Sequence, residues 1–245
     1  MAAAFAAVLL VGLVLVVLAR LESRRLANED ERFRREAAGR NWTFGVRTEN
    51  RTRVRYWTGT TDGIRWQAES RRAAPPRRHR SGGADRCLRW WADTLRGPSG
   101  AVLFLGLPEG AETPSFAIAE GSGALARMAQ HVAGRAFDRA VDLYFGADAG
   151  GQVNAATLKK VDGGTLPGYI VMAADSLEGA RRLATGMRAA MHEARHDLQP
   201  ERAHALMPWV LQLPRRISIA RMDTIQSTAE LERVARAGAA LVRCT

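Results

Sequence analysis

The uncharged apolar run at the start of the chain constrains the fold more than any other feature. Residues 1–19, MAAAFAAVLLVGLVLVVLA, contain no charged side chain. As a helix, the run would be about 28 Å long at 1.5 Å per residue, close to the hydrocarbon thickness of a bilayer. Backbone polar groups inside a bilayer have to be satisfied within their own segment, so such a run must be helical. We therefore predict a transmembrane anchor over residues 1–20.

A cleaved signal peptide is the alternative interpretation of the same run. Val17 and Ala19 loosely fit the small-residue rule for signal-peptide cleavage. However, the basic region that normally precedes the apolar stretch is missing, and the stretch is longer than is usual in a signal peptide. These departures favour an uncleaved anchor.

Six arginines follow the apolar run and predict its orientation. They are Arg20, Arg24, Arg25, Arg32, Arg34 and Arg35. Positive charge is retained on the cytoplasmic side of membranes, so we expect a single-pass protein of the plasma (inner) membrane with the bulk of its chain in the cytoplasm. Near anionic head groups, each arginine would contribute about 1 kcal/mol to contact with the membrane surface.

Residues 21–40 mix both charges at helical spacing and predict a basic juxtamembrane helix. Gly39 is a suitable C′ residue for the end of this helix. The helix would hold its arginines against lipid or form a solvated stalk, and these two interpretations are compatible.

The charge of the chain is concentrated beside the predicted anchor. The formal net charge is +11. From Arg20 to Arg96 there are 20 basic and 10 acidic residues, a net of +10, whereas the remainder has 16 and 15, a net of +1.

Cys87 and Cys244 are too far apart for a metal-binding or disulfide motif, which predicts free thiols in a reducing compartment.

Residues 53–72 predict a β-hairpin. Asp62-Gly63 is the strongest short signal for one, because a type I′ turn needs positive φ at both central residues. The resulting register pairs Thr61 with Ile64, Thr60 with Arg65, Gly59 with Trp66, Thr58 with Gln67, Trp57 with Ala68, and Tyr56 with Glu69. One face of the hairpin is then aromatic and the other polar, and Trp66 is expected to lie over Gly59.

The other elements predict an α+β fold. An Arg/Pro/Gly-rich segment at about 72–84 cannot bury apolar area and predicts a disordered loop. Further strands are expected over residues 86–94, 101–107 (central in the sheet), 168–173, 210–213 and 216–222. Helices are expected over 123–145, from about Asp175 onward, with Asp175 and Glu178 as a capping box, and over 227–242. Because strands cluster early without regular β-α-β alternation, we expect residues 41–245 to form one α+β domain: a mostly antiparallel sheet packed with about three helices.

The motif MHEARH in the predicted helix after Asp175 raises the question of catalysis. His192, Glu193 and His196 spell H-E-x-x-H, which places two metal ligands and a general base on one helix turn. The motif resembles that of the zincin metalloproteases. The resemblance would imply a zinc ion bound by His192 and His196, with Glu193 as the catalytic base.

The surroundings of the motif favour a solvated helix face over a zinc site. Zincins keep uncharged residues inside the motif, whereas Arg195 stands inside it here. A helical projection places the two histidines roughly 150° from the centre of the apolar stripe, on the side of Arg181 and Arg188. Like charge opposes a dication, so we predict no catalytic, cofactor-binding or metal-ligating residue and keep zinc as the alternative.

Tryptophans and arginines alternate in the basic part of the chain, as in some nucleic-acid and lipid-interface proteins. We favour the interpretation in which the tryptophans are core residues and the arginines form the outer face of the same strands. A nucleic-acid partner is therefore not expected.

Together these features predict a membrane-anchored protein whose cytoplasmic domain is a non-catalytic binding or regulatory module. The bilayer and another membrane protein would be its partners. A membrane-anchored zinc hydrolase and a membrane-tethered nucleic-acid binder using the loop Arg71–Arg80 are the alternatives.

Overall fold

The computed structural model describes most of the chain in nine ranges. These are residues 2–49, 52–72, 100–108, 114–120, 159–161, 169–173, 176–198, 209–221 and 224–245, and in the first helix the side chains are described from Gly12 onward, Leu15 excepted. The predicted strand over 86–94, the predicted helix over 123–145, the predicted loop beyond Arg72, and Cys87 lie outside the described residues.

The described strands form one antiparallel sheet. Its order is β1-β2-β3-β4-β9-β8-β5-β7-β6, and each pair of neighbours is antiparallel. The bounds are β1 (Thr43–Glu49), β2 (Thr52–Thr61), β3 (Ile64–Arg72), β4 (Gly100–Gly106), β5 (Phe116–Glu120), β6 (Lys159–Lys160), β7 (Tyr169–Ala173), β8 (Trp209–Leu213) and β9 (Arg216–Arg221). With the helices, this arrangement confirms the α+β class and its antiparallel sheet.

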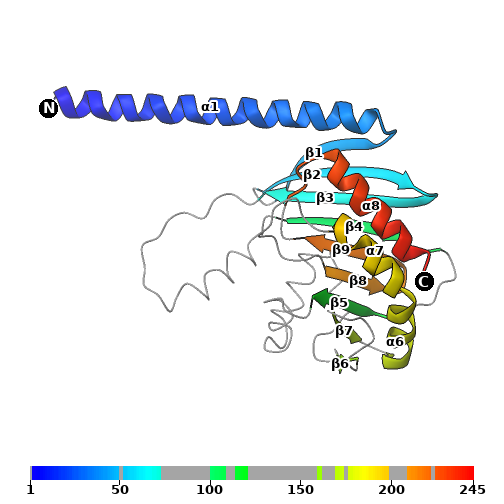
Figure 1. Cartoon of the computed structure of the whole chain (residues 1–245). Coiled ribbons are helices and arrows are strands. Elements are labelled where there is room, and N and C mark those ends of the chain that lie inside the picture. The colour runs from blue at the N-terminus through cyan, green and yellow to red at the C-terminus, as the bar shows by residue number, and fades with distance from the viewer. Residues whose placement is uncertain are drawn as a thin grey trace.

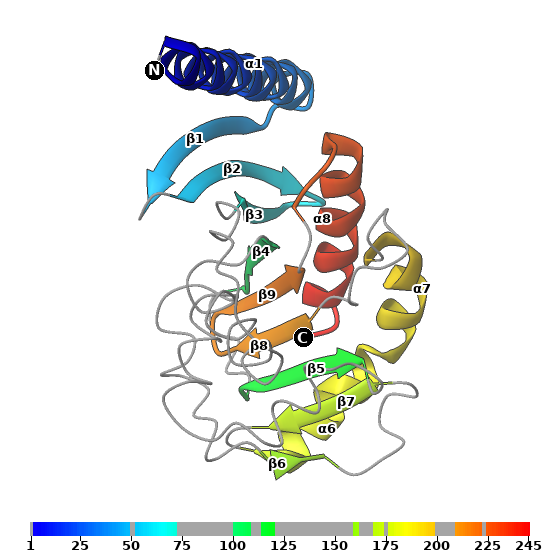
Figure 2. The same cartoon turned by 90° about the vertical axis from the view of Figure 1, so that its left-hand side faces the viewer.

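The helices gather on one face of the sheet. They are α1 (Ala2–Ala38), α6 (Leu177–Gly186), α7 (Arg188–Leu198) and α8 (Thr228–Val242). Figure 2 shows α8 and α7 beside the same side of the strands, with α1 next to β1. Period-2 alternation supplies the apolar layer beneath them: Trp57, Ala68, Leu103, Leu105 and Ile219 are buried on that face. In α8 the Cα of Gly238 packs so closely that an added Cβ would lie 2.8 Å from a methyl carbon of Leu105.

The β2–β3 hairpin has the predicted register throughout. Trp57 lies opposite Ala68 and Gly59 opposite Trp66. The turn residues Asp62 and Gly63 have φ values of 51° and 80°, as a type I′ turn requires. Both tryptophans are buried, so their role in the core is confirmed for this hairpin.

Helix α1 ends at Ala38, but its C′ residue is Asn41 and not the predicted Gly39. Gly39 is not in the left-handed conformation; Asn41 is, with φ 57°. The amide of Trp42 donates to the carbonyl of Ala37 and that of Asn41 to the carbonyl of Ala38, which is a Schellman motif with Asn41 at C′. Asparagine tolerates this conformation, and the next residue, Trp42, packs into the core.

In the described part of the chain, none of the helices is sufficiently long and apolar to cross a bilayer.

The helix predicted from Asp175 is divided into two. Ser176, not Asp175, is the N-cap of α6, and its hydroxyl accepts from the amide of Gly179 at 3.0 Å. The helix breaks at Gly186, a poor helix former, and the buried Met187 separates α6 from α7. Most of the predicted apolar stripe is buried, but Leu177 is 41% exposed because it lies at the first residue of α6.

The close approach at Gly59 generates a stability prediction. A Cβ added there would lie 2.5 Å from Cζ2 of Trp66 and 2.7 Å from Cδ1 of Trp42. We expect Gly59→Ala to lower the free energy of unfolding by about 1–3 kcal/mol, because two buried indoles would have to move. Urea titration followed by far-ultraviolet circular dichroism measures this change.

Gly106→Ala is the matched control, since a Cβ at that strand glycine would meet nothing within 4 Å. It should leave stability unchanged or raise it slightly. Equal destabilisation by both substitutions would contradict the steric explanation.

Candidate functional site

An aromatic cluster fixes the last turns of α1 on the first two strands. Phe33 is 1% exposed and its ring centroid lies 5.3 Å from that of Trp57, edge to face. Phe44 completes the cluster at 5.9 Å from Phe33 and 5.2 Å from Trp57. Phe44 and Trp57 are cross-strand partners in β1 and β2, while Ala37, one helix turn after Phe33, is also buried. One turn of α1 is therefore part of the hydrophobic core.

A buried carboxylate lies beside this aromatic cluster. Asp30, with 8% of its side chain exposed, accepts from Arg53 and, at 2.8 Å, from Nε of Arg55. Arg55 also donates to Glu29 at 2.9 Å, and its guanidinium lies 5.1 Å from the ring centroid of Phe33. Removing one member of a buried ion pair leaves its partner uncompensated, so these contacts fix the position of α1 along β2.

Helix α1 is also bonded to the C-terminal helix. The hydroxyl of Thr228 donates to Glu36 at 2.6 Å, and Arg32 donates to the carbonyl of Gln226 at 3.3 Å. Arg40 pairs with Glu232 at 3.0 Å. The last turns of α1 are therefore fixed both to the first strands and to the C-terminal part of the domain.

The preceding part of α1 has apolar side chains that face outward. Figure 1 shows the helix continuing well past the sheet toward its N-terminus. Six large apolar residues there are 47–62% exposed: Leu13, Val14, Val16, Val17, Leu18 and Leu21. A contiguous exposed patch of this kind marks an interaction surface.

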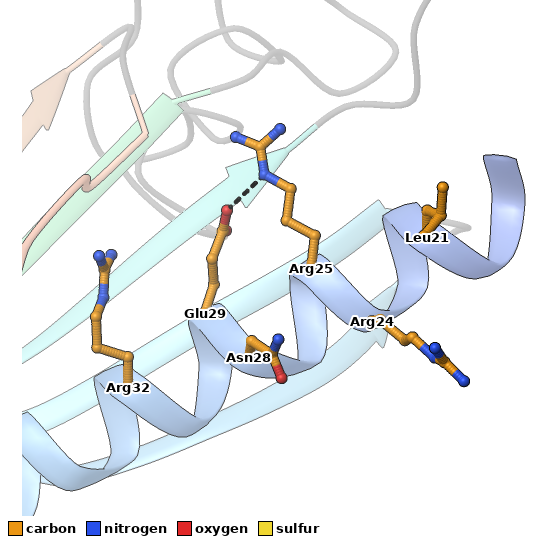
Figure 3. A pocket seen from close by; sticks show the side chains of 6 residues that line it. All are labelled: Leu21, Arg24, Arg25, Asn28, Glu29 and Arg32. Atoms are coloured by element: carbon orange, nitrogen blue, oxygen red, sulfur yellow. Dashed lines mark hydrogen bonds and ion pairs between the residues drawn. The ribbon is translucent and has the colours of Figure 1, made fainter.

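A shallow polar hollow of about 470 Å³ lies along α1 just after the apolar part. Its described lining, drawn in Figure 3, consists of Leu21, Arg24, Arg25, Asn28, Glu29 and Arg32. Nε of Arg25 lies 3.3 Å from Glu29, and the dashed line in the figure marks this pair. Partial burial acts to raise the pKa of Glu29, but Arg55 and Arg25 together outweigh it, so the pKa is lowered from 4.5.

The six arginines predicted to meet the membrane surface fall into two groups. Arg25, Arg32, Arg34 and Arg35 contact acceptors on α1 or in the segment before α8. Arg20 and Arg24 are exposed and have no hydrogen bond or ion pair in the part of the chain that the structure describes. The two arginines nearest the apolar run are therefore available for an external anion.

The H-E-x-x-H motif lies on α7. His192 and Glu193 are both exposed, and the side chain of His196 is outside the described residues. Among the residues that the structure describes, no group of three or more His, Cys, Asp or Glu side chains could hold a metal ion.

Cys244 is a free thiol, and it donates to the carbonyl of Ala240 at 3.4 Å.

A second buried carboxylate, not predicted from the sequence, lies on the opposite face of the sheet. Glu69 is 5% exposed and accepts from Arg47 at 2.7 Å, Arg71 at 2.8 Å and Gln67 at 3.1 Å. Burial acts to raise the pKa of Glu69, but the hydrogen bonds and charges of Arg71 and Arg47 outweigh it and lower the pKa below 4.5. The hairpin register places Glu69 on its polar face, but the partner Arg47 comes from β1, whose pairing the sequence does not predict.

No known protein family matches the chain, and neither curated proteins nor solved structures provide a similar one.

The buried pair of Asp30 generates a second prediction. Asp30→Asn should lower the free energy of unfolding by about 3 kcal/mol, because Arg53 would lose its charged partner and Arg55 would keep only Glu29. Hydrogen exchange should rise in residues 29–38 at the same time. Glu31→Gln is the control: Glu31 pairs with Arg34 at the surface, and we expect a change of at most about 0.5 kcal/mol. Similar losses for both variants would refute a special role for Asp30.

The lowered pKa of Glu69 predicts how stability depends on pH. A carboxyl whose pKa is lower in the folded state contributes stability that is present above 4.5 and lost as the pH falls through the folded pKa. Glu69→Gln should therefore be less stable than the unsubstituted protein at neutral pH, and this difference should shrink below about pH 4.5. Thermal unfolding at a series of pH values measures it. A difference that stays constant down to pH 3 would contradict the prediction.

Proposed function

We propose that the protein is a single-pass protein of the plasma (inner) membrane. Residues 1–20 would be its anchor, and the α+β domain would act in the cytoplasm as a non-catalytic binding or regulatory module for another membrane protein. The exposed apolar part of α1 is the observation that carries the proposal.

The apolar side chains of α1 support the anchor. The described ones, from Leu13 to Leu18, are about half exposed and belong to a run that has no charge from residue 1 to residue 19. Exposing such a helix to water is unfavourable by roughly 25 cal/mol per Å² of apolar surface, whereas lipid would cover it.

The arginines at the end of the run support the orientation. Arg20 and Arg24 are exposed where the head groups of the cytoplasmic leaflet would lie. Long arginine side chains can reach the head groups while their stems remain among the acyl chains. Positive charge on this side of the anchor favours a cytoplasmic domain.

The attachment of the last turns of α1 to β2 and α8 supports a binding or regulatory role. Glu29 on α1 accepts from Arg55 on β2, and the eight residues 21–28 between the proposed anchor and this contact span about 12 Å at 1.5 Å per residue. The domain would be held at a fixed height and in a fixed rotation relative to the bilayer. A module that acts on a neighbouring membrane protein needs such positioning, whereas an enzyme acting on freely diffusing substrates does not.

Membrane extraction tests the anchor. The full-length protein should remain in the membrane pellet after alkaline carbonate and high salt. The triple variant Leu13→Arg, Val16→Arg, Val17→Arg should be released, because three charges in the second half of the span add a cost that reaches about 2.5–3.5 kcal/mol for an arginine at the centre. The control Glu178→Arg, Thr185→Arg, Ala189→Arg places three arginines at exposed sites of α6 and α7 and should remain in the pellet. Release of the unsubstituted protein would sink the proposed anchor.

Labelling of Cys244 tests the orientation. In a Cys87→Ser background, a membrane-impermeant maleimide should label Cys244 in inverted inner-membrane vesicles and not in right-side-out vesicles. The reverse pattern would place the domain on the other side of the membrane.

A further inference from the structure

The shallow hollow along α1 lies directly after the part of the helix that is proposed as the anchor (Figure 3). Leu21, the first residue of its described lining, is exposed and continues the apolar surface. Arg24 and Arg25 follow residue 20 by four and five positions, or about 6–8 Å along the helix axis. The polar zone of one leaflet is roughly 5–7 Å thick, so both arginines would lie at the depth of the lipid phosphates.

The carboxylates beside the hollow are already engaged by other groups. Glu29, the one acidic residue of the described lining, accepts from Arg55 at 2.9 Å and lies 3.3 Å from Arg25. Glu36 lies 3.8 Å from Arg32 and also accepts a hydrogen bond from α8 at 2.6 Å. Each carboxylate is therefore shared between two donors, and the described lining keeps three arginines against one glutamate.

Arg24, Arg25 and Asn28 keep free donors at this hollow. Arg24 and Asn28 are exposed, and neither has a hydrogen bond or ion pair in the part of the chain that the structure describes. Arg25 donates to Glu29 through Nε, which leaves its two terminal nitrogens for another acceptor. Asn28 lies about 40° around the helix from Arg24 and about 60° from Arg25, and Figure 3 shows it between the two diverging arginines. An anion above the Asn28 amide would be flanked by both guanidinium groups.

We propose that this hollow binds the phosphate group of an anionic phospholipid, held by Arg24 and Arg25 above the amide of Asn28. Guanidinium groups form charge-assisted hydrogen bonds with phosphate oxygens, and Leu21 would lie beside the first acyl carbons. The inference rests on the proposed function, because the lipid reaches the hollow from the bilayer that α1 enters. It goes beyond that function by assigning a bound lipid to one face of α1 in place of a diffuse basic surface.

The exposure of the hollow favours a lipid over a free phosphate ion. Ion pairs of exposed arginines are weak in water, since both charges are well solvated. A lipid phosphate is already concentrated at the surface where Arg24 and Arg25 would lie, so weak contacts are sufficient to hold it there. A soluble phosphate has no such advantage at a shallow site.

The surface of α1 offers positions that separate a binding site from a diffuse attraction. Attraction to an anionic leaflet depends on the number of charges and on their distance from the bilayer. Ser23 and Ala27 are exposed at nearly the same depth as Arg24 and Arg25, but each lies at least about 100° around the helix from Asn28. Moving both charges to these positions keeps their number and depth and removes them from the hollow.

Native mass spectrometry of the full-length protein in non-ionic detergent, titrated with phosphatidylglycerol or phosphatidylcholine at physiological ionic strength, tests the proposal. Phosphatidylglycerol should bind in preference to phosphatidylcholine. Arg24→Gln together with Arg25→Gln should weaken its binding by about fivefold for each arginine. The relocated variant Ser23→Arg, Arg24→Gln, Arg25→Gln, Ala27→Arg should bind as weakly as this pair, although its net charge is that of the unsubstituted protein.

Arg34→Gln together with Arg35→Gln is the matched control, because it removes the same charge from exposed positions of α1 outside the described lining. It should leave binding unchanged. Absence of a preference for phosphatidylglycerol, an equal loss in this control, or full binding by the relocated variant would each overturn the proposal. Displacement of the lipid by soluble glycerophosphate would assign the hollow to a free phosphate and overturn it as well.

Carbonate extraction separates this inference from the proposed function. A protein that stays in the membrane pellet but shows no lipid preference has the anchor and lacks the site. Release of the protein into the supernatant removes the anchor, and with it the route by which a lipid would reach the hollow.

Discussion

The ion pairs of Asp30 with Arg53 and Arg55 hold α1 in its position on the sheet. The carboxylate of Asp30 lies in the only turn of α1 that faces both the arginines of β2 and the aromatic cluster around Phe33, among the described residues. A charge buried beside aromatic rings is stable only with its partners in place, so the helix has one favourable position along the strand. In this position Glu36 and Arg40 also reach α8, where they contact Thr228 and Glu232.

Local signals predict much of the fold because they act over a few residues. Asp62-Gly63 selects the turn, and alternation of apolar and polar residues then sets the register of the hairpin without any distant contact. The ends of helices are less well predicted, since several residues compete for each role. Asn41 takes the left-handed position that Gly39 could have taken, and Ser176 caps α6 in place of Asp175.

The candidate sites are less predictable because they depend on contacts between distant segments. Arg53 and Arg55 meet Asp30 across more than twenty residues, and each is an ordinary charged residue in its own segment. The pairing of β9 with β4 likewise brings Arg216 beside Gly106 across more than a hundred residues. The arginines after the apolar run could be predicted, because their place at the end of that run is visible in the sequence itself.

Because the last turns of α1 are attached to the domain, the length of the segment between Leu21 and Asn28 sets how the domain is rotated about the axis of α1. Because α1 is one continuous helix fixed to the domain at its end, each residue inserted there would turn the domain by about 100° about the helix axis and lengthen the helix by about 1.5 Å. Seven inserted residues would restore the facing to within about 20° at a greater height. The length of this segment, more than its composition, then selects which face of the domain meets a neighbour fixed in the same plane.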